Sequence, residues 1–223
     1  MASIVRNEQG IRSMFAILTR AKGAIRESEL EELAGVSVWD LQNLPVAVMR
    51  WFSVGEEGGE RTFCFAHPLL AEEFGAVLGR EAEQAGQKLV EWCARWEQHK
   101  SAYALRYFAQ HLYDQILEGL ATAKPPISEG EATAEPKIPE PLFELARNEE
   151  FARTQEEVLP HEPDLPLQTL QLALDVAIKR DLPKEMAEML LRHAKRVEGA
   201  ETPLQAQERG EKERAIRLAK QRL

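Results

Sequence analysis

The spacing of hydrophobic residues changes once in the N-terminal third of this chain, and the change limits the folds open to it. Residues 11–44 carry apolar side chains at helical intervals. The first of these helices carries Ile11, Met14, Phe15 and Leu18, and Gly23 ends it. Residues 46–66 alternate instead, with a break at the Gly-Glu-Glu-Gly-Gly run of residues 55–59. Three helices followed by a hairpin predict a winged helix-turn-helix domain, which we assign to residues 1–78.

Local start and stop signals bound the second and third helices. Ser28 followed by Glu31 predicts a capping box at the start of the second helix, and Gly35 supplies its left-handed end. Ser37 begins the third helix, which Pro45 ends because proline lacks a backbone donor. Both helices are therefore expected to be short.

The second strand of the hairpin leads directly into another helix. This strand, over residues 61–66, places Phe63 and Phe65 on one face because successive strand residues point to opposite sides. His67 and Pro68 follow, and proline is favoured in the first turn of a helix. We therefore expect a helix to start at this point.

Helical spacing dominates the rest of the chain, apart from one segment. The expected helices cover residues 68–78, 81–99, 101–117, 142–155, 165–180 and 183–197. We assign residues 79–120 to a helical extension and residues 142–223 to an arm built around a helical hairpin. Residues 121–141 are rich in Pro, Glu, Ala and Thr and predict an exposed linker. The predicted fold is mainly α, with a small β-hairpin and a TPR-like helical arm.

Sequence signals for catalysis are missing. The chain has no glycine-rich phosphate loop with its lysine, and His161-Glu162 lacks the second histidine of a zinc signature, because Leu165 stands at that position. Cys64 and Cys93 lie in apolar surroundings, which favours buried thiols in a reducing compartment. We expect no enzymatic activity, no cofactor and no metal. Packing is also the expected role of the aromatic run Trp92, Trp96, Tyr103, Tyr107 and Tyr113.

The charge balance argues against nucleic acid and membrane partners. The chain has 28 Lys and Arg against 37 Asp and Glu, a net charge of -9, which repels phosphate backbones. The third helix has no Lys or Arg and offers Trp39, Asp40, Gln42 and Asn43. Arg50 and Arg61 are the only cations of the hairpin strands. A winged-helix transcription regulator therefore stays an alternative, to be tested by salt-sensitive duplex binding.

Four strings of residues, in order, resemble the C-terminal half of STAND signalling ATPases, the family that holds NACHT and NB-ARC proteins. The strings are FCFAHPLLAEEF (residues 63–74), YALRYFAQHLYD (103–114), LARNEEF (145–151) and TPLQAQERGEKERAIRLA (202–219). The first is similar to the end of the family's winged-helix domain, and the second to the helix that leads into a superhelical sensor arm. The chain itself carries no Walker lysine.

The resemblance gives one residue a possible role. His67 matches the family's histidine that contacts the diphosphate of bound ADP and keeps the switch closed. An imidazole beside a helix N-terminus can donate a hydrogen bond to a phosphate oxygen. A histidine that only caps its own helix fits the sequence equally well. His111 has a similar position in the family, but we expect it to pack in the core.

These observations lead to one leading hypothesis and two alternatives. We expect a cytoplasmic, non-enzymatic regulatory module whose winged helix docks on a nucleotide-binding domain, in cis or in trans. The helical arm would bind a protein partner. The alternatives are the DNA-binding regulator and a helical scaffold protein in which the winged helix is only structural.

Overall fold

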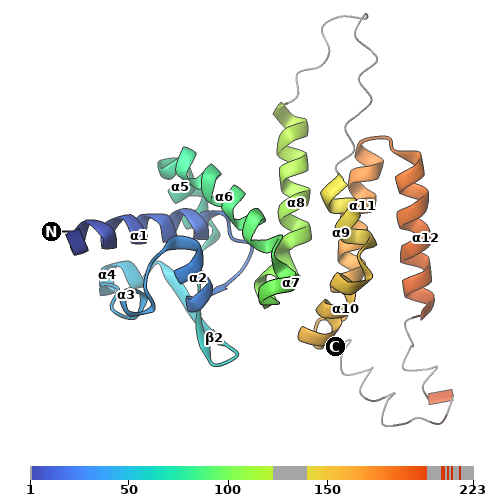
Figure 1. Cartoon of the computed structure of the whole chain (residues 1–223), viewed down its shortest axis with the longest axis horizontal. Coiled ribbons are helices and arrows are strands. Elements are labelled where there is room, and N and C mark those ends of the chain that lie inside the picture. Colours follow the sequence, from blue (N-terminus) through green and yellow to red (C-terminus); the bar gives the residue numbers. More distant parts are fainter. Residues whose placement is uncertain are drawn as a thin grey trace, which may run out of the picture. The chain divides into compact units, whose positions relative to one another are not determined.

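A computed structural model describes residues 2–122 and 140–199 of the chain. It also describes five later positions: Gln207, Glu208, Gly210, Lys212 and Ile216. The chain is mainly helical with a small antiparallel sheet of three strands within the described residues (Figure 1), which confirms the coarse fold class. Most of the expected linker at 121–141, and most of the expected arm beyond residue 199, lie outside the described residues.

The chain divides into two compact units, Met1–Phe108 (unit 1) and Ala109–Leu223 (unit 2). The division falls within helix α8 (Ala102–Thr122), inside the segment expected to be a helical extension. We describe each unit by itself.

Unit 1 contains the sheet. Its elements before α8 are α1 (Ala2–Arg20), β1 (Ile25–Arg26), α2 (Glu27–Ala34), α3 (Val38–Gln42), α4 (Val46–Met49), β2 (Phe52–Glu57), β3 (Glu60–Phe65), α5 (Pro68–Leu78), α6 (Arg80–Cys93) and α7 (Trp96–His99). The strand order is β1-β3-β2, and all pairs are antiparallel. Gly58 and Gly59 form the hairpin turn, with φ of +62° and +82°, values that glycine adopts without strain. The predicted hairpin is confirmed, although Gly55 continues β2 instead of breaking it.

The first strand of the hairpin is shorter than expected. Residues 46–49, predicted to be strand, form α4, because the Val48 and Met49 amides donate to the Pro45 carbonyl, at 2.8 and 3.0 Å. Proline fixes φ near the helical value and therefore suits the start of this turn. Strand β1 was not expected, since two residues carry no periodic signal.

Two helix predictions also need correction. The capping box predicted at Ser28 is wrong: the residue before the first turn of α2 is Arg26, two residues earlier, and its amide donates to Glu29 Oε2 at 3.0 Å. The Ser28 hydroxyl instead donates to Glu60. The single helix expected over residues 81–99 is two, α6 and α7, separated by a turn in which the Arg95 amide donates to the Trp92 carbonyl.

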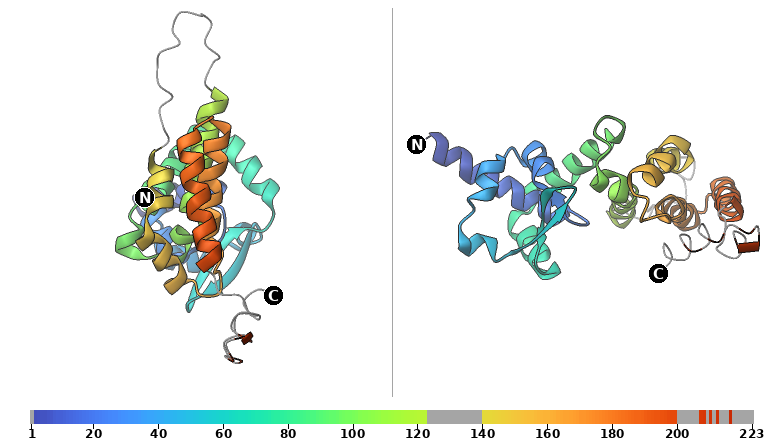
Figure 2. Two further views of the ribbon diagram at one scale, coloured as in Figure 1. Left: turned by 90° about the vertical axis from the view of Figure 1, so that its right-hand side faces the viewer. Right: turned by 90° about the horizontal axis from the view of Figure 1, so that it is seen from below.

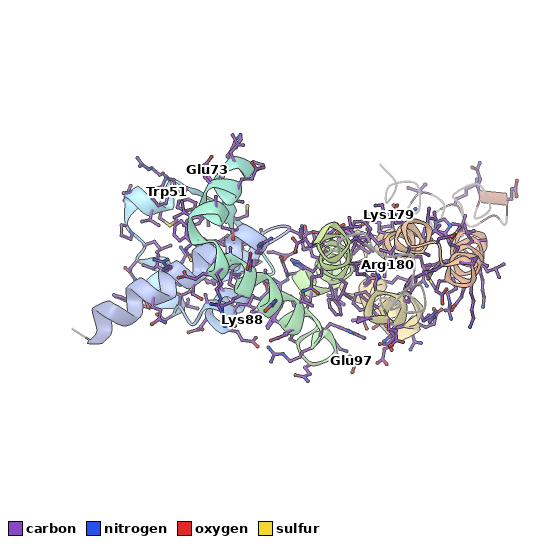
Figure 3. All side chains as sticks on the ribbon, turned by 90° about the horizontal axis from the view of Figure 1, so that it is seen from above. Trp51, Glu73, Lys88, Glu97, Lys179 and Arg180 are labelled. Atoms are coloured by element: carbon purple, nitrogen blue, oxygen red, sulfur yellow. The ribbon has the colours of Figure 1, made fainter. Side chains whose placement is uncertain are left out.

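The core of unit 1 centres on helix α1, which packs against α5 and α6 (Figure 1). Phe15 on α1 contacts four aromatic rings at centroid distances of 4.8 to 5.8 Å: Trp51, Phe52, Phe65 and Phe74. Figure 3 shows Trp51 beside Glu73 of α5, the neighbour of Phe74. Aromatic side chains of the expected core are buried too: Trp92, Trp96 and Tyr103. The aromatic cluster around Phe15 fixes α5, and with it the preceding residue His67, on the sheet.

Helices are the regular structure of unit 2 in its described residues. After the second part of α8, its helices are α9 (Glu140–Arg147), α10 (Glu149–Val158), α11 (Leu165–Lys179) and α12 (Pro183–Gly199). The hairpin of α11 and α12 is confirmed, and α11 lies between α12 and the pair α9–α10 (Figure 2). The single helix expected over 142–155 is two helices, because Asn148 caps a new one: its side chain accepts from the Glu150 and Phe151 amides at 2.9 and 3.0 Å.

Candidate functional site

Unit 2 contains a groove of about 550 Å³ formed by residues of α9, α10, α11 and α12. Buried apolar side chains line it, among them Leu145, Phe151 and Leu170. Leu191 of α12 also lines the groove but is 72% exposed. A cavity of this size that is lined by both apolar and polar side chains is a candidate binding site.

Charged side chains of α12 line one side of this groove. They are Glu188, Arg192, Lys195 and Arg196. The guanidinium of Arg192 lies 3.0 Å from Glu188 and 3.4 Å from Glu149, and that of Arg196 lies 2.7 Å from Glu156 and 3.5 Å from Glu149. Glu149, the first residue of α10, thus accepts from two arginines of α12.

Glu188 and Lys195 complete the electrostatics of the groove. Hydrogen bonds from Arg147 lower the pKa of Glu188 to about 2, with a smaller contribution from Arg192 and against the opposing effect of burial. Lys195 is exposed, and among the described residues no acidic side chain pairs with it. The lining residues therefore carry three cationic and two acidic side chains, in a chain whose net charge is -9.

The structure places His67 at the surface of unit 1, as the residue that caps α5. Its Nδ1 accepts a hydrogen bond from the Leu69 amide at 3.2 Å. The capping role that the sequence allowed is therefore present. Because Nδ1 accepts, the neutral ring carries its proton on Nε2. The candidate contact to a phosphate stays a prediction. His111, by contrast, is buried, as expected.

The surfaces that would contact DNA in a winged helix offer little positive charge. Helix α3 has only five residues and no cation. Arg61 on β3 lies 3.1 Å from Glu27 and stacks over Phe63, and Arg50 lies over Trp51. The carboxylate of Glu57, at the end of β2, is paired with Arg106 at 2.7 Å. The cations noted in the sequence are therefore used within unit 1.

Tyr113, the last residue of the aromatic run, stabilises unit 2 through hydrogen bonds instead of forming a site. Lys179 at the end of α11, next to Arg180 in Figure 3, donates to the Tyr113 hydroxyl at 2.6 Å and to Asp175 at 2.5 Å. Tyr113 in turn donates to Asp175 at 2.6 Å. These bonds hold the second part of α8 on α11. They lower the pKa of Asp175, chiefly through Lys179.

Neither cysteine belongs to a reactive arrangement. Cys93 is fully buried, and burial raises the pKa of its thiol, with a smaller effect from Glu29. Cys64 was expected to be buried but is partly exposed, and its thiol donates to the Ser53 carbonyl at 3.9 Å. The part of the chain that the structure describes has no group of three or more His, Cys, Asp or Glu residues that could hold a metal ion. No helix among those residues is long and apolar enough to cross a membrane.

The groove is the feature that sequence reasoning missed. Glu149 and Arg196 are 47 residues apart, and no local pattern links them. A partial signal exists, because Glu188, Arg192, Lys195 and Arg196 recur at helical spacing on α12. Comparisons with models of protein families, with curated proteins and with solved structures found no match to this chain.

Proposed function

We propose that this chain is a non-enzymatic regulatory and protein-interaction module of a STAND-type signalling NTPase. Unit 1 would contain its winged-helix domain, over residues 1–78, and unit 2 would contain its TPR-like sensor arm, over residues 142–223. The observation that carries the proposal is the order of elements in unit 1, helix-strand-helix-helix and the one-turn helix α4, followed by a β-hairpin, with the strands arranged β1-β3-β2. This arrangement suits a winged helix, and the STAND-like string with His67 begins within its last strand, β3.

The geometry of His67 is compatible with a latch. Since Nδ1 is engaged by the Leu69 amide, Nε2–H of the exposed ring is left to donate to an external acceptor. A phosphate oxygen of ADP held by a separate nucleotide-binding domain is such an acceptor. The chain would then sense the nucleotide without hydrolysing it.

Exposed apolar residues favour a protein surface over DNA as the partner of unit 1. Trp39 on α3 is 69% exposed, and Val46 at the start of α4 is 87% exposed. A five-residue α3 without cations cannot place basic side chains in a major groove. We therefore favour docking of unit 1 on a nucleotide-binding domain, with nucleotide exchange changing that interface and unit 1 rotating as a rigid body.

The proposal is tested by adding a separate nucleotide-binding domain to the chain. The full chain is mixed with a panel of STAND nucleotide-binding domains loaded with a fluorescent ADP analogue, and release of the analogue is measured. We expect at least one complex that retains the nucleotide, and about tenfold faster release for His67→Ala and for His67→Ser, the loss expected for one charge-assisted hydrogen bond. Serine keeps the helix cap, so an effect shared by both variants reports the latch.

Four results would contradict the proposal. The isolated chain could bind or hydrolyse ATP, which requires a site that the sequence lacks. If no member of the panel binds the chain, or if release of the ADP analogue is unchanged in both His67 variants, the helical scaffold is favoured. Salt-sensitive binding to duplex DNA would favour the transcription regulator.

A further inference from the structure

We infer that the groove of unit 2 binds an acidic, partly apolar peptide segment of a partner protein, and that Glu149 occupies the place of the partner's carboxylate in the free chain. The inference rests on the proposed role of the arm in binding a partner. It names the chemistry of that partner and the residues that recognise it.

The apolar part of the groove defines one half of the partner. Leu145, Phe151 and Leu170 are at most 6% exposed and come from three successive helices, so they are fixed by the packing of unit 2. Leu191 is 72% exposed at the same groove. An apolar side chain that enters the groove removes this leucine from water, which favours binding.

The charged part of the groove defines the other half. Arg192 and Arg196 are each held by a short pair, with Glu188 at 3.0 Å and Glu156 at 2.7 Å. Their contacts to Glu149 are longer, at 3.4 and 3.5 Å. The two guanidinium groups are therefore positioned by other residues, and the Glu149 carboxylate is the weakly held member of the network.

Glu149 is also placed so that it can leave. Its side chain is 70% exposed, and Asn148 supplies the cap of α10, so the helix start does not depend on the Glu149 carboxylate. Rotation of this side chain into water would expose both arginines to an incoming carboxylate of the same chemistry. The free chain thus carries an internal competitor for its own ligand.

Charge complementarity selects an acidic occupant over a basic one. The groove is lined by three cations and two acids, and Lys195 has no acidic partner among the described side chains. If Glu149 moves away, Arg192 and Arg196 each keep one acidic partner, Glu188 and Glu156, and Lys195 has none among the described side chains. A peptide with Asp or Glu next to Leu, Ile or Phe fits this surface, whereas a lysine-rich peptide meets like charge.

A peptide library tests the inference with the full chain. A random library of short displayed peptides is selected against the wild-type protein, and enriched peptides are synthesised for fluorescence polarisation. We expect enrichment of Asp or Glu beside a large apolar residue. Lys195→Glu should weaken binding by about fivefold or more, and Glu149→Gln should strengthen it by about threefold, in line with the loss of one surface charge contact.

A matched variant separates the groove from the general charge of α12. Lys184→Glu makes the same change on an exposed lysine of α12 that does not line the groove, and it should leave binding within about twofold of wild type. Leu191→Asp should abolish enrichment, and circular dichroism should show that this exposed site leaves the fold intact.

Enrichment of basic or uncharged peptides would overturn the inference, as would no enrichment, or equal effects of Lys184→Glu and Lys195→Glu. Tighter binding of a free fatty acid than of any peptide would also overturn it. These outcomes do not affect the nucleotide-release test of His67, because that test depends on a residue of unit 1. The experiments therefore distinguish a wrong assignment of the groove from a wrong proposed function.

Discussion

Arg147 at the end of α9 and Glu188 on α12 form a two-pronged ion pair: Arg147 Nε donates to Oε1 at 2.9 Å, and its second nitrogen donates to Oε2 at 2.8 Å. Parallel bonds of this kind are the strongest arrangement available to a carboxylate and a guanidinium. Because α9 and α12 flank α11, the pair closes unit 2 across its central helix. It also fixes Glu188, and through Glu188 the position of Arg192.

Glu188→Gln should therefore destabilise unit 2 at neutral pH. We expect a loss of about 1 kcal/mol, the upper range for a surface pair, because the Glu188 side chain is one-third exposed (33%). The pKa of Glu188 is about 2, below its usual value of 4.5, so the ionised pair stabilises the folded state above pH 4.5 and is lost as pH falls toward 2. The difference between wild type and variant should shrink over that interval, measured by urea unfolding with circular dichroism.

The same substitution at Glu157 is the control, since this exposed residue of α10 has no ion pair among those described. Glu157→Gln should leave the urea midpoint almost unchanged at every pH. A Glu188→Gln penalty that stays constant from pH 7 to acid would show that the pair does not stabilise unit 2 through its charge.

Signals confined to one turn of the chain were predictable from sequence. Ser37 caps α3 by accepting from the Asp40 amide at 3.1 Å, and Gly35 ends α2 with φ of +67°. Pro68 lies in the first turn of α5 as expected. Each of these signals depends on backbone groups at most four residues away, so the sequence contains all the information needed.

Features that depend on distant partners were missed. Strand β1 exists only because Ile25 and Arg26 pair with Phe63 and Thr62 of β3. The groove depends on the approach of α10 and α12, which places Glu149 near Arg196. Hydrophobic periodicity predicts which face of a helix is buried, but it does not state which polar residues meet across two helices.

Gly23 is a second case in which the reason for a residue lies far along the chain. It was expected only to end a helix, but a Cβ at this position would lie 2.4 Å from the Tyr107 hydroxyl and 2.7 Å from the adjoining ring carbon. We predict that Gly23→Ala destabilises unit 1 by about 1 to 3 kcal/mol through overpacking. All four tryptophans lie in unit 1, so their fluorescence during urea unfolding reports this loss.

A double-mutant cycle tests the assigned cause. In the background of Tyr107→Leu, which removes the far end of the ring, Gly23→Ala should lower the free energy of unfolding by less than half as much as in the wild type. Gly75→Ala is the control: its nearest neighbour would be Thr19 at 3.9 Å, and within α5 alanine should be neutral or stabilising by up to about 1 kcal/mol. Equal costs of Gly23→Ala in both backgrounds would rule out Tyr107 as the cause.

The cap at His67 has a stability effect that is separate from any contact with nucleotide. His67→Ala removes the acceptor of the Leu69 amide and should cost about 0.5 to 1 kcal/mol in the isolated chain. His67→Ser restores an acceptor and should recover most of this loss. Tryptophan fluorescence during urea unfolding measures both. If serine is no better than alanine, the imidazole does not stabilise α5 by capping.

Thiol chemistry distinguishes the two cysteines of unit 1. Cys93 is fully buried with a raised pKa, so little thiolate forms near neutral pH and reagents cannot reach it, whereas Cys64 is partly exposed. Titration with a chromogenic disulfide should therefore detect one fast thiol in the native protein and two after denaturation in guanidinium. Cys64→Ser should remove the fast thiol, and Cys93→Ser should leave it. Two equally fast thiols in the native chain would mean that α6 and α8 open readily around Cys93, since only such opening gives the reagent access to it.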